Sequence, residues 1–202
     1  MRKGIVLGIM MCLISVANAQ YDAKAKAILQ KVSSKYESMS SYAVDFVNKL
    51  HSPLAGIDEE TKGKATIAGE KFRIELEDHL IIVDGKSMWT FMKEDNEVNI
   101  SEFEPDESEV NPSNIFKMWE KGYKYRMLDT DAINSIKHNV IELTPEDKTN
   151  QIFKVKLWIN PSNNTIKKWS MFEKSGNRYT YIINKFNPKP TITTSTFKFD
   201  KT

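Results

Sequence analysis

Hydrophobic residues near the start of the chain follow a helical spacing. After Asp22, a residue type that caps helices, apolar residues recur every three or four positions as far as Met39. This spacing puts them on one face of an amphipathic helix of about five turns, which ends at Ser40-Ser41. The sequence therefore predicts one helix that buries a single face.

From Tyr42 onward the spacing changes to two, which is the pattern of a half-buried strand. Tyr42, Val44 and Phe46 share one face, and in residues 71–77 apolar residues alternate with charged ones. Successive side chains of a strand point to opposite faces, so each of these strands is apolar on one face only. This is typical of antiparallel sheets.

Turn residues separate a series of such strands. Asp84-Gly85 favours a tight hairpin because both residues tolerate positive φ. Strands are predicted around Lys64 and Phe72, and at Tyr42–Leu50, Leu80–Val83, Lys86–Met92, Val98–Phe103, Tyr123–Leu128, Val140–Leu143, Ile152–Ile159, Thr165–Glu173, Arg178–Phe186 and Thr194–Phe199. About eleven or twelve strands joined by short links predict one large antiparallel sheet.

A second, short helix is predicted between Asn111 and Gly122, with Pro112 at its first position. About two turns of it carry four large apolar side chains: Ile115, Phe116, Met118 and Trp119. Such a segment must pack against the sheet. Because two helices are too few to cover one wide apolar face, either a cavity or a thin core is expected there, and a face left partly unfilled would have room for a guest hydrocarbon.

The first 19 residues have the features of a secretory signal peptide. Residues 1–3 are cationic, residues 5–16 are apolar, and Ala17-Asn18-Ala19 is a small-x-small cleavage site before Gln20. The apolar stretch is too short to span a bilayer. Cleavage would leave residues 20–202 as a single exported domain.

Cysteine and charge narrow the possible functions further. Cys12 lies within the apolar stretch without small residues before it, which disfavours lipidation there, and no other cysteine exists to form disulfides. Removing residues 1–19, which hold two basic and no acidic residues, leaves 27 basic and 27 acidic residues. A chain without excess positive charge is a poor candidate for binding nucleic acid.

Candidate chemistry is sparse. The three histidines are far apart in sequence, and the acidic run Glu94–Glu109 lacks the ligand spacing of a calcium loop, so no metal site is predicted. Ser195–Lys198 matches S-x-x-K but lies in a predicted strand, and Glu75 and Glu77 flank a wetted surface beside Arg73. No catalytic residue and no cofactor site are predicted, which leaves a secreted hydrolase as the disfavoured alternative from another class.

Several motifs, taken in order, resemble the LolA family of periplasmic carriers of outer-membrane lipoproteins. They are the hairpin IVDGKSMW at residues 82–89, NPSNIFKMW at 111–119, NTIKKW at 164–169, SGN at 175–177 and the final TFKF at 196–199. The resemblance covers almost all of the chain after residue 19. It implies an incomplete antiparallel barrel of about 11 strands, mainly β, with helices as a lid over a hydrophobic cavity.

The resemblance also implies partners. In this family a carrier takes a lipoprotein from an inner-membrane ABC transporter, shields its acyl chains, and delivers it to an outer-membrane acceptor, without a covalent step. A monomer without cofactors is expected. An outer-membrane acceptor, or another exported lipid-binding protein on the same half-barrel, is the alternative.

Alternation and the resemblance together predict the cavity. The lid is assigned to Ile115, Phe116, Met118 and Trp119. The residues expected to line the sheet are Phe46, Phe72, Ile74, Leu76, Trp89, Phe91, Val155, Leu157, Trp169 and Met171. The family's Arg-Pro pair, whose arginine helps to hold the lid closed, is absent here, where residues 68–71 read AGEK. Another polar contact, or a looser lid, is therefore expected.

Overall fold

The computed structural model describes residues 21–104 and 113–200. In these ranges it has one α-helix, one short 3₁₀ helix and twelve strands. The helices are α1 (Ala23–Glu37) and η1 (Met118–Glu120). The first six strands are β1 (Tyr42–Ser52), β2 (Ile57–Ala68), β3 (Lys71–Leu76), β4 (His79–Val83), β5 (Ser87–Met92) and β6 (Glu97–Glu102). The others are β7 (Tyr123–Met127), β8 (Asp131–Ile133), β9 (Ile136–Pro145), β10 (Ile152–Ile159), β11 (Ile166–Glu173) and β12 (Arg178–Asn187).

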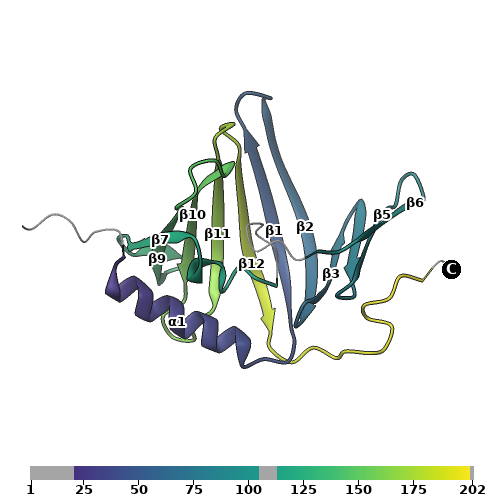
Figure 1. Ribbon diagram of the computed structural model, residues 1–202, viewed down its shortest axis with the longest axis horizontal. Helices are drawn as coiled ribbons and strands as arrows, with labels where there is room; N and C mark the ends of the chain where they lie inside the picture. Colours follow the sequence, from purple (N-terminus) through teal and green to yellow (C-terminus); the bar gives the residue numbers. More distant parts are fainter. Residues whose placement is uncertain (1–20, 105–112, 201–202) are drawn as a thin grey trace, which may run out of the picture.

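The strands form one open antiparallel sheet in the order β6-β5-β4-β3-β2-β1-β12-β11-β10-β9-β7, with β8 paired to β9. Almost every neighbour in this order is also a neighbour in sequence, because short links join successive strands. β1 and β12 pair in the middle and join the two halves. Since β6 and β7 are unjoined edges, the large antiparallel sheet predicted from the residue pattern is open, as the family resemblance implies (Figure 1).

Helix α1 begins and packs as its sequence predicts. The Asp22 carboxylate accepts hydrogen bonds from the backbone N–H groups of Lys24 and Ala25, at 2.8 and 3.1 Å. Its second oxygen accepts from the N–H of Met127 in β7, at 3.1 Å. One side chain therefore caps the helix and ties its first turn to the edge of the sheet. The helix lies across one face of the sheet (Figure 1).

The prediction of a second helix between Asn111 and Gly122 is wrong for the residues of this segment that the structure describes. Residues 113–117 form turns followed by the single 3₁₀ turn η1, while Asn111 and Pro112 lie outside the described residues. The carbonyl of Phe116 accepts from the Ser33 hydroxyl at 2.8 Å, and the N–H of Glu120 bonds the carbonyl of Lys117. In an α-helix the Phe116 carbonyl would accept from the Glu120 N–H, but here it accepts from Ser33 of α1. A short helix is also unfavourable to nucleate, so the segment does not continue as a helix.

The predicted last strand, Thr194–Phe199, is also wrong. This stretch forms turns: the N–H of Thr193 donates to the Thr196 hydroxyl at 2.9 Å, and the N–H of Lys198 to the carbonyl of Ser195 at 3.1 Å. The apolar alternation nevertheless has a cause, since Phe197 is only 8% exposed. The segment leaves β12 and ends beside the β3–β6 half of the sheet (Figure 1).

Candidate functional site

The two faces of the sheet are covered differently. We call the face under α1 and residues 113–120 the inner face, and the opposite one the outer face. Cross-strand partners point to the same side of a sheet, so register assigns each strand residue to one of them. The inner face and its cover share one core cluster, which contains the buried side of α1: Ala25, Leu29, Val32 and Tyr36.

Eight of the ten residues predicted to line the cavity lie on the inner face. They belong to its core cluster or pack against it: Phe46, Phe72, Ile74, Leu76, Val155, Leu157, Trp169 and Met171. They come from the strands β1, β3, β10 and β11, and β2 and β12 supply the surface between these strands. The sequence pattern therefore identifies most of one continuous apolar surface.

Trp89 and Phe91 are placed on the outer face, so their assignment to the cavity is wrong. They pair with Ile82 and Leu80 of β4, whereas the inner residue Val83 pairs with Met88. Alternation shows which residues of a strand share a face, but not which face. On the outer face the Phe91 ring contacts Phe199 of the C-terminal segment, with the two ring centroids 5.7 Å apart.

The four predicted lid residues all lie against the inner face. Ile115, Phe116, Met118 and Trp119 are between 5% and 8% exposed and belong to the core cluster. The Phe116 ring stacks on Tyr36 of α1 with centroids 5.2 Å apart and planes at 9°. Residues 113–120 and α1 thus form a single cover over the sheet, which we call the inner cover.

Ser33 of α1 holds the two parts of the inner cover together. Its hydroxyl donates to the carbonyl of Phe116 at 2.8 Å and accepts from the indole N–H of Trp119 at 2.9 Å. All three groups are buried, so both bonds replace contacts with water. Ser33 therefore supplies a buried polar contact between the two parts of the inner cover. Sequence reasoning missed it, although a serine on the apolar side of a helix, between Leu29 and Tyr36, is a visible signal.

Beneath the inner cover the structure is nearly filled. The void there measures about 30 Å³ and is lined only by apolar and aromatic residues: Tyr36, Tyr42, Val44, Ile67, Ile115, Ile166, Trp169 and Ile183. This is room for one or two water molecules, against the roughly 300–1,000 Å³ of a typical ligand pocket. The partly unfilled face expected from the sequence is thus not present in this conformation, because the cover's own side chains fill it.

The void is electrically neutral. Burial raises the pKa of the Tyr36 and Tyr42 phenols, so both stay protonated across the physiological range. No charged side chain lines this void. Such a lining suits hydrocarbon and is unsuited to charged ligands.

Near the other end of the inner face, Phe46 and Leu76 close over Gly63 of β2. A Cβ atom at Gly63 would lie 2.5 Å from the Phe46 ring and 2.7 Å from Leu76. Glycine therefore lets these two side chains meet across β2. A cleft of about 370 Å³ also reaches this point, with Lys62, Lys64 and other charged residues at its rim.

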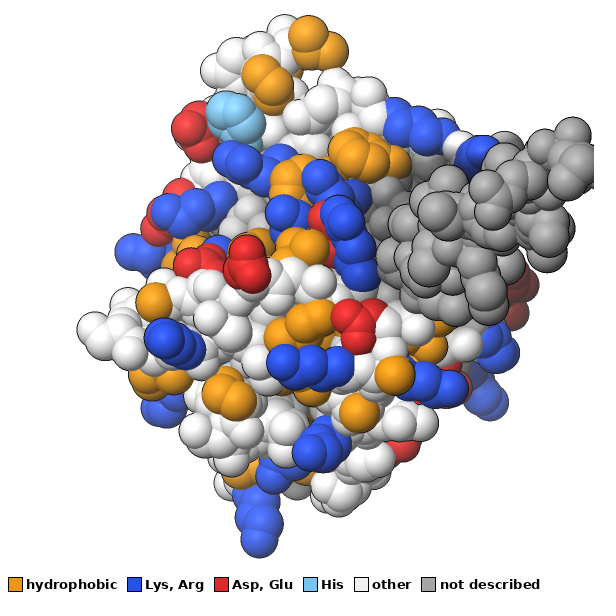
Figure 2. All heavy atoms as spheres, turned by 90° about the vertical axis from the view of Figure 1, so that its left-hand side faces the viewer, with side chains coloured by type: hydrophobic (Ala, Val, Ile, Leu, Met, Phe, Trp, Pro, Cys, Tyr) orange, Lys and Arg blue, Asp and Glu red, His pale blue; other side chains and the backbone are white. Residues whose placement is uncertain are grey.

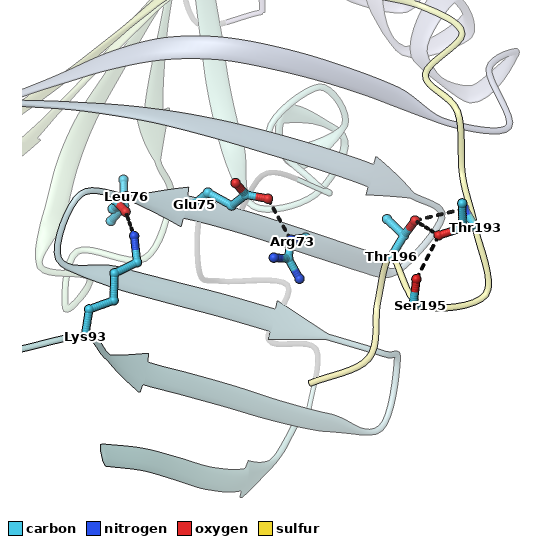
Figure 3. A network of polar contacts seen from close by, with 7 residues as sticks. All are labelled: Arg73, Glu75, Leu76, Lys93, Thr193, Ser195 and Thr196. Carbon is cyan, nitrogen blue, oxygen red and sulfur yellow. Dashed lines mark hydrogen bonds and ion pairs between the residues drawn. The ribbon is translucent and has the colours of Figure 1, made fainter. Parts of the chain in front are cut away.

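The outer face is polar by comparison. Arg73 pairs with Glu75 along β3 at 2.7 Å, and Lys93 donates to the carbonyl of Leu76 (Figure 3). A cleft of about 330 Å³ separates this surface from the C-terminal segment, and it is lined by Arg73, Leu80, Ile82, Ser195, Lys198, Phe199 and Asp200. Arg73 therefore takes no part in holding the inner cover.

The surface gives no further candidate within the described ranges. Residues 21–104 and 113–200 hold no group of three or more potential metal ligands. Within the same ranges, α1 and η1 are not long and apolar enough to cross a bilayer. On the face seen in Figure 2, hydrophobic side chains are scattered among basic and acidic ones.

Comparison with known proteins agrees with this architecture. Residues 37–200 match the family model described as outer membrane lipoprotein carrier protein LolA. Among solved structures, the chain is similar to an uncharacterized conserved protein from Thermus thermophilus, with a TM-score of 0.59 and 12% identity over 88% of this chain and 94% of that one. It is also similar to LprF from Mycobacterium bovis, with a TM-score of 0.53 and 13% identity over 88% and 99%. These structural likenesses concern the fold alone. Comparison with curated proteins gives no match.

Proposed function

This chain belongs to the LolA family of outer-membrane lipoprotein carrier proteins, and from that premise we propose that it carries acylated lipoproteins across the periplasm. Their acyl chains would lie between the inner face and the inner cover. The family consists of carriers rather than enzymes, and the proposed role needs no covalent step.

The energetics of an acyl chain explain why a carrier is needed. Transfer of hydrocarbon out of water is worth about 0.8 kcal/mol per CH₂ group, so one chain of about 15 methylenes represents ~12 kcal/mol. Such a chain does not leave a membrane for free water at a useful rate. A carrier must supply a comparable apolar surface and still release the chain at its destination.

The observation that carries the proposal is the construction of the inner cover. It fills the apolar face with side chains that belong neither to the sheet nor to its hydrogen-bond ladder, and a single serine bonds its two parts. Moving it aside would break the hydrogen bond from the Ile166 N–H of β11 to the Tyr36 hydroxyl, at 3.2 Å, and would expose a large apolar surface without separating a pair of strands. Because the ligand must displace the cover, net affinity is lowered, which favours release.

The route follows from the same premise. The signal peptide predicted in residues 1–19 would deliver the protein to the periplasm. There it would receive cargo from the inner-membrane ABC transporter and pass it to an outer-membrane acceptor. Both partners belong to the proposal, as does the monomeric state.

Purification of the protein from its native periplasm, followed by lipid and proteomic analysis, tests the proposal. Acylated lipoproteins are expected to co-purify with it in stoichiometric amounts. Recovery of the protein without any acylated ligand, under conditions in which the lipoproteins are being exported, would contradict it.

The N-terminus separates the carrier from its alternative. A membrane-attached acceptor needs a lipidated cysteine, and Cys12 is the only cysteine in the chain. Mass spectrometry of the native protein is expected to find Gln20 as its first residue. An acylated Cys12 would identify an outer-membrane acceptor instead.

A further inference from the structure

Among residues 21–104 and 113–200, two buried polar atoms on the inner face have no hydrogen-bond partner. They are the Oδ1 atom of Asn48 in β1 and the indole N–H of Trp169 in β11. Buried polar groups in folded proteins are almost always paired, and leaving one unpaired costs free energy. Two such atoms on one apolar surface therefore need an explanation.

The two residues are neighbours of the same tyrosine. Asn48 and Trp169 each pair with Tyr181 of β12, one from either side, so all three point to the inner face. The Trp169 and Tyr181 rings stack with centroids 4.7 Å apart and planes at 10°. This stack holds the indole in place, with an orphan donor on one side of Tyr181 and an orphan acceptor on the other.

This pair adjoins the space that the inner cover fills. Trp169 lines the 30 Å³ void together with Ile115 of the cover and Tyr36 of α1. Displacement of the cover would therefore extend the void along Trp169 toward Tyr181 and Asn48. A hydrocarbon chain entering there would bring the polar group at its head within reach of the pair.

We propose that Asn48 and Trp169 form a polar subsite in the space between the inner face and the inner cover. This subsite would bind the amide that links an acyl chain to its headgroup. The Trp169 N–H would donate to the amide carbonyl, and Asn48 Oδ1 would accept from the amide N–H. This inference rests on the proposed function and adds to it two residues that would recognise the amide at the head of the acyl chain.

The spacing of the two residues suits a single amide. Their strands are separated by one strand, so their backbones lie about 9.5 Å apart. A trans amide has its C=O and N–H pointing in opposite directions, so one amide lying over Tyr181 could accept from the Trp169 side and donate to the Asn48 side. A hydrocarbon has neither group and would leave both protein atoms unpaired, which gives the subsite selectivity.

The substitution Trp169→Phe tests the donor, because it removes the N–H and keeps a ring to stack on Tyr181. The probes are a tripalmitoylated S-glyceryl-cysteine peptide and dodecyl maltoside, whose chain carries no amide or ester. The variant is expected to bind the lipopeptide roughly three- to tenfold more weakly and dodecyl maltoside as the wild type does. Equal affinity of variant and wild type for the lipopeptide would overturn the proposal.

Thermal denaturation separates this role from a structural one. Trp169→Phe removes an unpaired buried donor but also shortens the ring that packs on Tyr181, and because these two effects oppose each other the ligand-free variant is expected to melt close to the temperature of the wild type. The stabilisation by lipopeptide should become smaller. A large fall in the melting temperature of the ligand-free variant would instead show that the indole N–H supports the fold, which contradicts the subsite.

The substitution Asn48→Leu tests the acceptor and the amide. It is expected to weaken binding of the tripalmitoylated peptide several-fold, and to leave binding of the dipalmitoylated peptide, whose cysteine amine is free, within about twofold. Equal loss for both peptides would contradict an amide site.

The affinity of the wild-type protein for a short-chain ceramide is measured separately. Wild-type protein that prefers the ceramide to the lipopeptide takes a free N-acyl lipid as its ligand rather than a lipoprotein.

The same data distinguish failure of this inference from failure of the proposed function. Wild-type protein that binds neither lipopeptide contradicts carriage of lipoproteins. Wild-type protein that binds both equally tightly, with unchanged affinity in both variants, leaves carriage intact and removes the subsite.

Discussion

The inner and outer faces of the sheet are both covered by an irregular segment that buries a phenylalanine, yet they offer ligands opposite conditions. Phe116 of the inner cover and Phe197 of the C-terminal segment are each 8% exposed. The inner void is about 30 Å³ and lined without charged residues, whereas the outer cleft is about 330 Å³ and combines charged residues (Arg73, Lys198, Asp200) with apolar ones (Leu80, Ile82, Phe199).

By volume alone the outer cleft resembles a ligand pocket and the inner void does not. The chemistry of the two linings reverses that choice, because charged groups oppose entry of a hydrocarbon. The comparison teaches that cavity volume alone does not identify a binding site for a flexible apolar ligand. A better indicator is an apolar surface that is covered by a segment able to move aside.

The largest expected effect comes from placing a charge on each face. Leu76→Glu puts a carboxylate on the inner face and is expected to lower acyl-chain affinity at least about a hundredfold. Leu80→Glu, on the adjacent strand but lining the outer cleft, is the matched control and should stay within about twofold of the wild type. Dye-displacement titration with the lipopeptide measures both. Equal losses would show that the faces are not distinct in function.

Removal of one phenylalanine from the inner cover should raise acyl-chain affinity, and by less than Leu76→Glu lowers it. The matched control removes one phenylalanine from the C-terminal segment. Phe116→Ala is expected to lower the free energy of unfolding by about 3 kcal/mol and to raise lipopeptide affinity about tenfold, because the ligand then displaces less. Phe197→Ala should lower stability comparably without raising affinity. Urea denaturation and titration measure the two quantities, and tighter binding by both variants would contradict a specific role for the inner cover.

The serine that bonds the inner cover gives a third, weaker test. Ser33→Ala leaves the Trp119 N–H and the Phe116 carbonyl without their partner, which is expected to cost about 1–3 kcal/mol and to raise affinity a few-fold. Ser170 is equally buried, but its hydroxyl bonds Thr180 on the outer face at 2.9 Å. Ser170→Ala should therefore lower stability and leave affinity unchanged, as measured in the same two assays. Unchanged affinity in Ser33→Ala would show that this contact does not hold the cover closed.

The smallest effect concerns the anchor of α1 at Asp22. Hydrogen bonds from the backbone N–H groups of Ala25 and Met127 lower the pKa of its carboxyl below the usual 3.8. A lowered pKa in the folded state means that this stabilisation is present above about pH 4 and is lost as the pH falls through the folded value. Asp22→Ala should thus cost about 1 kcal/mol at about pH 7 and progressively less below about pH 4, in urea denaturation at each pH. A difference that stays constant down to about pH 2 would contradict this contribution.

Much of the fold could be predicted because its signals are local. Asp22 and the following spacing specify α1, and alternation between turn residues specifies most strands. The short strand β8 leaves no pattern of its own, and the alternation of Thr194–Phe199 reflects packing on the outer face rather than pairing. In both places tertiary contacts decide what local propensity does not.

The site was harder to predict because it depends on register and on distant contacts. A link of either two or four residues after Val83 pairs it with an even-numbered residue, Lys86 or Met88, so tracing register across the hairpins would have put Trp89 and Phe91 outward. The bond between Ser33 and Phe116 joins residues 83 positions apart, so the sequence can mark Ser33 as an unusual residue on an apolar helix face but does not identify its partner. Faces can thus be derived from the sequence with care, whereas the cover's contacts cannot.

The central claim is that the inner cover occupies the ligand's place and moves when a ligand binds. Fluorine NMR of protein labelled with 5-fluorotryptophan tests it most directly, with resonances assigned by single Trp→Phe variants. Trp119 reports on the cover through its bond to Ser33, and Trp158 reports on the outer face, where its N–H donates to Asp131 at 2.8 Å. On addition of the tripalmitoylated peptide, the Trp119 resonance is expected to shift and to become accessible to a soluble paramagnetic agent, while that of Trp158 stays unchanged. Saturating ligand that leaves Trp119 buried and unshifted would contradict the account.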